Sequence, residues 1–170
     1  MRQLNLMLIG CGLLFATVPA SAAEPLGEWL VENGSAHIRI DNCGGALWGI
    51  VTWEKSPGRD NENPDPALRG RPTLGMPILL DMKPNGDRWE GEIYNPENGK
   101  LYQSNIRLSA PNTLRVEGCV LGFLCGGQSW TRVADTATSG SARGAQKGAA
   151  KGGNASPVCS RVSNLPGRTH

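Results

Sequence analysis

Residue types that catalytic and metal sites require are scarce in this sequence. It has two histidines and five cysteines, and no two cysteines show the C-x-x-C spacing of common zinc sites. No serine stands in the G-x-S-x-G context of a hydrolase nucleophile. We therefore expect no metal site, no cofactor and no catalytic residue, and we do not expect an enzyme.

Long apolar runs are also missing, and the longest one lies near the N-terminus. Residues 4–18 are almost entirely apolar, follow the positive charge of Arg2 and precede small residues around Ala22. This run is shorter than the roughly 20 residues that cross a bilayer, and the layout is typical of a secretory signal peptide. We predict that residues 1–22 are cleaved near Ala22, which leaves a periplasmic or secreted chain without a transmembrane segment. Lipidation at Cys11 is a disfavoured alternative, because apolar residues would remain uncleaved behind the lipid.

Large apolar and aromatic residues are nearly absent from residues 134–170. Such a segment cannot bury enough surface to offset the entropy of ordering, so we predict a disordered tail whose removal leaves the thermal midpoint unchanged. It carries five basic residues and one acidic residue, whereas residues 24–133 carry fourteen acidic and eleven basic residues. The basic tail could touch anionic envelope polymers or could simply be solvated. Nucleic acid is not an expected partner.

Four cysteines remain after the predicted signal peptide. Cys119 and Cys125 flank a short glycine-containing segment where two strands could be joined, so we predict a disulfide between them. Cys43 and Cys159 are left, and they could pair with each other, pair between chains or stay free.

Residues 24–133 show the period of two that is typical of half-buried strands. Ala36, Ile38 and Ile40, for example, alternate with polar residues. Turn signals rich in glycine, proline and asparagine separate eight such segments, which favours a closed sheet without exposed edges. We predict an all-β fold, a small eight-stranded antiparallel up-and-down barrel followed by the disordered tail. The expected strands are residues 28–32, 36–41, 47–53, 74–82, 89–94, 102–108, 113–118 and 128–133.

Two residues far apart in this segment resemble a feature of lipocalin-like, calycin-type barrels. Gly27-Glu28-Trp29 opens the first expected strand, and Arg132 lies at the end of the last one. In those barrels a late arginine covers the tryptophan of a G-x-W motif on the first strand. The resemblance implies a structural cation–π contact between Trp29 and Arg132.

A longer set of motifs resembles the bacterial family known as domain of unknown function 2147. The resemblance covers about residues 25–133 and implies a small calycin-type barrel in exported proteins, with no activity attached. It also implies a second cysteine at the position of Trp48, so a local partner for Cys43 is missing. The motifs are D-x-x-N-P-D-P-x-L-R-x-R-P-x-L-G (60–75), W-x-G-x-I-Y-N-P-x-x-G-K-x-Y (89–102), L-x-V-x-G-C (114–119) and W-T-R (130–132).

Residues 54–73 form a connection that is too long for a simple turn, and such loops often bind ligands. Asp65 before a proline suits the start of a short helix. Asp60, Asn63 and Asp65 offer oxygen atoms, and Arg69 and Arg71 offer planar donors. The functional interpretation is a polar cluster at the barrel mouth that holds a cation or the anionic head of a ligand. The structural interpretation, which we favour, is that the arginines pair with these side chains and hold the loop in place.

The leading functional hypothesis is a periplasmic or secreted module that binds a small apolar or amphipathic molecule. The alternative is a ligand-free structural or interaction protein of the bacterial envelope, since small barrels can be filled by their own side chains. Only about half of the candidate aromatic residues can point inward. The candidate ligand-binding residues are Trp48, Trp53, Trp89, Tyr94, Tyr102, Arg69 and Arg71.

Overall fold

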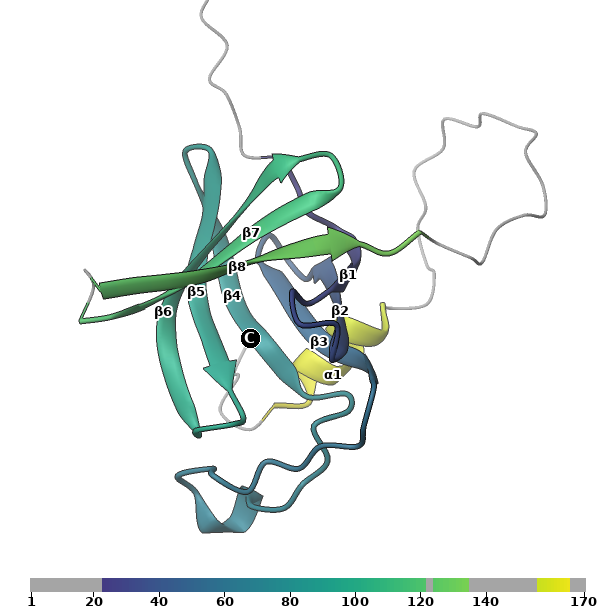
Figure 1. Cartoon of the computed structure of the whole chain (residues 1–170), viewed down its shortest axis with the longest axis vertical. Coiled ribbons are helices and arrows are strands. Elements are labelled where there is room, and N and C mark those ends of the chain that lie inside the picture. The colour runs from purple at the N-terminus through teal and green to yellow at the C-terminus, as the bar shows by residue number, and fades with distance from the viewer. Residues whose placement is uncertain (1–22, 122–123, 135–155, 166–170) are drawn as a thin grey trace, which may run out of the picture.

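Eight antiparallel strands close into one barrel in chain order, which confirms the predicted fold (Figure 1). The computed structural model describes residues 23–121, 124–134 and 156–165. The predicted signal peptide and Cys11 lie outside these residues. The strands are β1 (Gly27–Leu30), β2 (Ala36–Asn42), β3 (Leu47–Glu54), β4 (Pro77–Asn85), β5 (Arg88–Asn95), β6 (Lys100–Ala110), β7 (Thr113–Val120) and β8 (Leu124–Arg132); the helices are η1 (Pro66–Leu68) and α1 (Pro157–Ser163).

The predicted contact between Trp29 and Arg132 joins the first strand to the last. The two residues are register partners in the β1–β8 pair that closes the barrel. Trp29 is fully buried, and its indole Nε1 donates a 2.9 Å hydrogen bond to the carbonyl of Pro25. The Arg132 guanidinium lies 4.2 Å from the indole centroid and donates to the carbonyl of Leu26 at 2.7 Å. The contact therefore stabilises the closure of the barrel.

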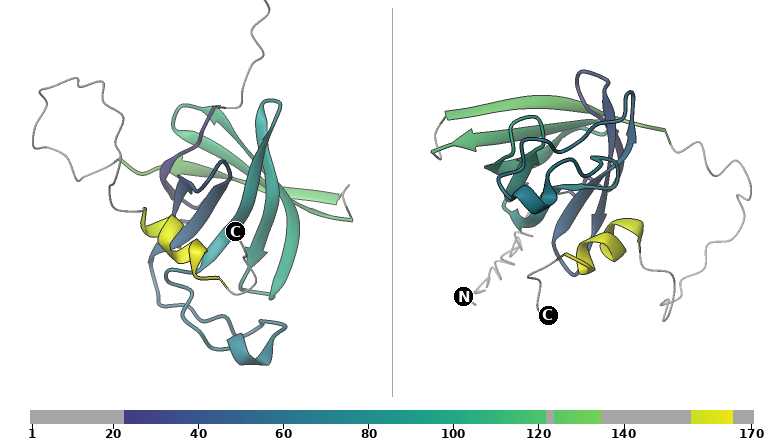
Figure 2. Two further views of the ribbon diagram at one scale, coloured as in Figure 1. Left: turned by 180° about the vertical axis from the view of Figure 1, so that it is seen from behind. Right: turned by 90° about the horizontal axis from the view of Figure 1, so that it is seen from below.

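The β7–β8 hairpin projects well beyond the barrel wall (Figures 1 and 2). Its strands stay paired as far as Val120 and Leu124. Cys119 and Cys125 are the neighbouring register pair on the barrel side. A disulfide joins them, which confirms the predicted pairing. The end of this hairpin is thus held as an extended ribbon.

The prediction that all of residues 134–170 are disordered is wrong for residues 156–165. Helix α1 begins after the Ser156 cap and packs against the outside of the barrel, in contact with β2, β3 and β4 (Figure 2). Val158 and Val162, two of the few large apolar residues in this segment, are fully buried. The average composition of the segment concealed this short apolar stripe. Residues 135–155 and 166–170 lie outside the described residues.

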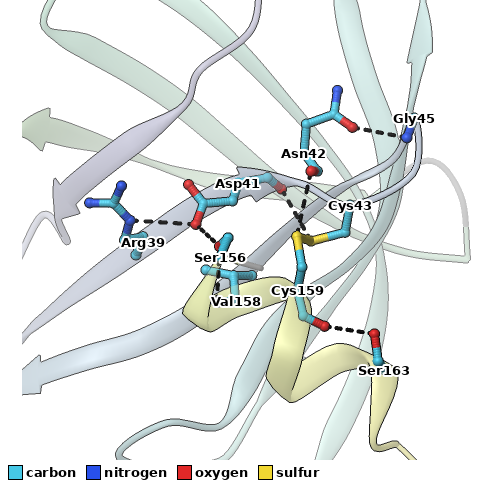
Figure 3. Close-up of a disulfide and its surroundings, with 9 residues drawn as sticks. All are labelled: Arg39, Asp41, Asn42, Cys43, Gly45, Ser156, Val158, Cys159 and Ser163. Carbon is cyan, nitrogen blue, oxygen red and sulfur yellow. Dashed lines mark hydrogen bonds and ion pairs between the residues drawn. A yellow bond between two sulfur atoms is a disulfide. The ribbon is translucent and has the colours of Figure 1, made fainter. Parts of the chain in front are cut away.

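A second disulfide fastens α1 to the barrel (Figure 3). It joins Cys43 to Cys159 over a sequence separation of 116 residues, which answers the question that the sequence left open. Beneath the helix, Trp48 packs with Val158 and Val162 in a small apolar cluster. The position where the family resemblance implies a second cysteine therefore holds a large side chain that α1 covers.

Candidate ligand-binding site

A pocket of about 540 Å³ opens at one end of the barrel. This volume is in the range of sites that take small organic molecules. Its inner wall is shared with the hydrophobic core, so the floor of the pocket is apolar. The core residues that also line it are Ile38, Val51, Ile78, Tyr94, Val116 and Trp130.

The rim of the pocket is polar and carries both signs of charge. Glu54 ends β3, Arg59 comes from the loop between β3 and β4, and Glu97 comes from the β5–β6 turn. The carboxylate of Glu54 accepts a hydrogen bond from the hydroxyl of Thr73, and Arg59 donates to the carbonyl of Gly70 at 2.6 Å. An apolar floor with a polar rim suits a molecule that has an apolar body and a polar end.

Glycines keep part of the pocket wall free of side chains. Gly118 on β7 and Gly126 on β8 are register partners, and both line the pocket. A Cβ atom added at Gly126 would meet no heavy atom within 4 Å. Space that a side chain could fill is therefore left open at this wall.

The loop between β3 and β4 is fixed by a polar cluster, in which the buried side chains of Asp60, Asn63 and Tyr94 meet the half-buried Arg71. Asp60 is fully buried, accepts a 2.6 Å hydrogen bond from the hydroxyl of Tyr94 and accepts 2.7 Å and 2.9 Å bonds from Asn63 and Arg71. Asn63 also donates to the Tyr94 hydroxyl oxygen at 3.0 Å. The cluster ties the loop to β5 beside the pocket, which is the geometry expected from the structural interpretation of the loop.

Two neighbours of the cluster also serve local structure. Arg69 donates to the carbonyl of Asn63 at 2.8 Å, and Asp65 accepts from the backbone N–H of Ala67 at 2.9 Å as the cap of η1. Next to Asn63, a Cβ at Gly99 would lie 1.7 Å from the carbonyl oxygen of Glu62. The β5–β6 turn therefore approaches the loop so closely that only glycine fits.

The cluster holds Asp60 ionised and Tyr94 neutral. Burial alone raises the pKa of Asp60, but hydrogen bonds from Tyr94, Asn63 and Arg71 outweigh burial and lower this pKa below its ordinary value of 3.8. Burial and the neighbouring Asp60 carboxylate raise the pKa of Tyr94 above its ordinary value of 10.0. Neither group changes its charge near neutral pH, so the pair suits an anchor better than a proton-transfer site.

We expect acid to weaken the fold through Asp60. Because the folded pKa of Asp60 is lowered, its contribution to stability is fully present above the ordinary pKa and is lost as pH falls through the folded pKa. Urea unfolding of the unmodified protein should therefore show a free energy of unfolding that falls more steeply than that of Asp60→Asn as the pH is lowered past the ordinary pKa of 3.8. Parallel pH profiles for the two proteins would contradict this role.

The predicted ligand-binding residues lie in different places. Tyr94 and Tyr102 line the pocket, and contact with a ligand stays a prediction for both. Trp89 is buried in the core, where its indole donates to the carbonyl of Ala23 at 3.2 Å. The described residues that line the pocket do not include Trp89, Trp48, Trp53, Arg69 or Arg71.

Trp53 is directed away from the pocket by an irregularity in the β2–β3 pair. The register shifts between His37 and Ile38, so Trp53 lies opposite His37. Its ring is 4.6 Å from the His37 ring, and the side chain remains 43% exposed. A bulge of this kind moves later residues of a strand to the other face, and simple alternation does not reveal it.

Several pocket residues were not among the sequence candidates. Ile38, Val51 and Val116 could have been found, because they lie on the apolar face of their strands. Gly118 and Gly126 carry no such signal, since their contribution is the space that they leave. The mouth residues Val120 and Leu124 lie in the segment between the cysteines, which the sequence interpretation treated only as a turn.

Two disulfides in a small domain fit an oxidising compartment. Among the residues that the structure describes, no helix has the length and apolar character needed to cross a membrane. The same residues contain no group of three or more histidine, cysteine, aspartate or glutamate side chains placed to hold a metal ion.

Comparisons with known proteins agree with the barrel. The chain is similar to a solved structure described as "Protein HP1028 from the human pathogen Helicobacter pylori belongs to the lipocalin family", with a TM-score of 0.60 and 20% sequence identity over 67% of this chain and 86% of that chain. At this level of sequence identity the similarity shows that the two proteins share a fold and nothing more. No curated protein matches the chain. Residues 27–132 match the model of a family described as "Uncharacterized protein conserved in bacteria (DUF2147)", and the chain belongs to this family.

Proposed function

We propose that this protein is a non-enzymatic binding module, exported from the cytoplasm, that holds a small apolar or amphipathic molecule in the open end of its barrel. The observation that carries the proposal is the pocket of about 540 Å³ with an apolar floor and a polar rim. Burial of an apolar ligand surface against this floor supplies the main driving force for binding. The lipocalin-like fold is compatible with this use.

The charges of the rim support one kind of polar group on the proposed ligand. Two carboxylates, of Glu54 and Glu97, and one guanidinium, of Arg59, face the mouth. A site with both signs of charge has no strong field of one sign, so it favours a neutral or zwitterionic polar end over a strongly charged one. Arg69 and Arg71, which the sequence offered as anion-binding residues, are engaged in the loop instead.

Filling the pocket from its glycine wall tests the proposal. We expect Gly126→Leu to weaken binding of the fluorescent apolar probe N-phenyl-1-naphthylamine by about tenfold or more, equivalent to at least about 1.4 kcal/mol. The new side chain would enter open space at the pocket wall, so the barrel should keep its circular dichroism spectrum. Binding is measured by fluorescence titration.

Thr131→Leu is the matched control, because Thr131 is an exposed residue of the same strand and is not part of the pocket lining. Its probe affinity should equal that of the unmodified protein. Equal affinity in Gly126→Leu would place the probe elsewhere and contradict the proposal.

Native mass spectrometry of the protein from its producing cells should show a bound small molecule, and a uniformly ligand-free protein would count against a carrier.

A further inference from the structure

Strand β8 has one edge that is only partly paired. Its other edge is paired with β7 from the hairpin to Thr131. The partly paired edge meets β1 in register only at Leu30–Thr131 and Trp29–Arg132, because the chain then turns back into β2. Among the residues that the structure describes, no strand pairs with this edge beside residues 125–129; we call this stretch the open edge.

Two hydrogen bonds define which way the backbone groups of β8 point. The N–H of Arg132 donates to the carbonyl of Asn112, next to β7, at 3.0 Å, and the N–H of Val133 donates to the carbonyl of Glu28 in β1 at 2.9 Å. Residues of a strand in an antiparallel sheet direct their N–H and C=O groups alternately to its two neighbours. Even-numbered residues of β8 therefore bond to β7, and odd-numbered residues face the side of β1.

The open edge consequently presents unpaired peptide groups. Gly127 and Ser129 are odd-numbered, and their backbone N–H and C=O groups have no hydrogen-bond partner within the described part of the chain. Natural edge strands usually carry charged residues or proline, which block pairing with another chain. Residues 124–130 contain neither a charged residue nor a proline. The open edge is therefore able to accept another strand.

The pocket opens sideways along this edge. Gly127, whose peptide groups face the open edge, lines the pocket, and so do Asn33 and Ser35 of the turn between β1 and β2. The gap between the open edge and that turn is thus part of the pocket mouth. Gln128 lies on the inner face of the strand, like the buried Trp130 two residues later, and yet it is exposed. This exposure agrees with an incomplete barrel wall at the open edge.

An unpaired strand edge beside an apolar pocket suits an extended peptide, because the edge bonds to the peptide backbone and the pocket takes alternate side chains. We propose that the ligand of the pocket is a short extended peptide that adds a strand antiparallel to the open edge and places an apolar side chain against the pocket floor. This inference rests on the proposed function and names the chemical class of its ligand. A peptide residue opposite Gly126 would lie on the inner face, where the absent side chain leaves room.

The composition of the site favours a peptide over a second copy of the chain. Two copies paired through residues 125–129 would present only Gly126 and Gln128 to each other's pockets, and neither residue can cover an apolar floor. The rim carries both signs of charge, through Glu54, Glu97 and Arg59, so it favours an uncharged peptide. A neutral peptide with apolar residues at every second position therefore matches both the edge and the pocket.

Binding of a blocked pentapeptide tests the proposal. The probe has threonine at its ends and centre, leucine at the positions between them, and acetylated and amidated termini. We expect saturable binding, detected by NMR as shifts of the backbone amides of Gly127 and Ser129, and displacement of N-phenyl-1-naphthylamine from the pocket. Replacement of both leucines by serine should weaken binding by about tenfold or more, because the apolar floor is then left without a partner.

Backbone methylation of the probe separates strand pairing from simple binding in the pocket. In antiparallel pairing, the peptide residues that bond to Gly127 and Ser129 lie directly opposite them and face outward as they do, so they are the threonines. N-methylation of the central threonine should weaken binding by about tenfold. N-methylation of one leucine is the matched control and should change the affinity much less. Equal losses from the two methylations would overturn the proposal.

The same titrations distinguish this inference from the proposed function. A protein that binds N-phenyl-1-naphthylamine but not the pentapeptide would overturn the peptide proposal and leave the pocket proposal standing. A protein that binds neither would contradict both. Pairing of the open edge with a second copy would appear as self-association in analytical ultracentrifugation, and self-association without peptide binding would overturn the proposal in favour of a dimer.

Discussion

Replacement of Asp60 by alanine is expected to lower the free energy of unfolding by about 3 kcal/mol, because it leaves buried polar groups without their acceptor. The carboxylate is fully buried and accepts hydrogen bonds from Tyr94, Asn63 and Arg71. Its loss also frees the loop between β3 and β4 from β5. Urea unfolding followed by tryptophan fluorescence measures the change.

Asp65→Ala is the control for this prediction. Asp65 is exposed and caps η1 through one hydrogen bond to Ala67, so its loss should cost only about 0.5–1 kcal/mol. A double change with Tyr94→Phe should be less than additive, because the two side chains share a hydrogen bond. Equal effects of Asp60→Ala and Asp65→Ala would contradict the anchoring role of the cluster.

Removal of the disulfide between Cys43 and Cys159 is the second large effect that we expect. The bond closes a loop of 116 residues, and loop-closure entropy assigns to such a bond about 4–5 kcal/mol of stabilisation. Cys43→Ser/Cys159→Ser should therefore lower the free energy of unfolding by up to that amount. It should also increase hydrogen exchange in α1, which the bond fastens to the barrel.

The second disulfide provides an internal comparison. Cys119 and Cys125 are only six residues apart, so Cys119→Ser/Cys125→Ser should cost only about 2 kcal/mol on the same entropic basis.

Chains without residues 134–170 should lose the stability that α1 contributes and show a lower thermal midpoint, contrary to the expectation from composition. An unchanged midpoint after that truncation would show that α1 contributes nothing to the fold.

The sequence by itself determined the barrel. Alternation of apolar and polar residues predicts where the strands lie, and turn residues predict where the hairpins form. Both signals are readable because they depend on interactions between near neighbours in the chain. Cys119 and Cys125 paired as predicted for the same reason, since one hairpin brings them together. The contact between Trp29 and Arg132 followed from a family resemblance on two short motifs.

Tertiary structure alone decided what lies on and around that barrel. Pairing of Cys43 with Cys159 and burial of Val158 depend on which outer face α1 meets after a long connection. The exposed position of Trp53 depends on a register shift against β2. The pocket depends on the space left by glycines of two adjacent strands. These features arise from surfaces that are distant in the chain and meet only after folding, so local periodicity holds no information about them.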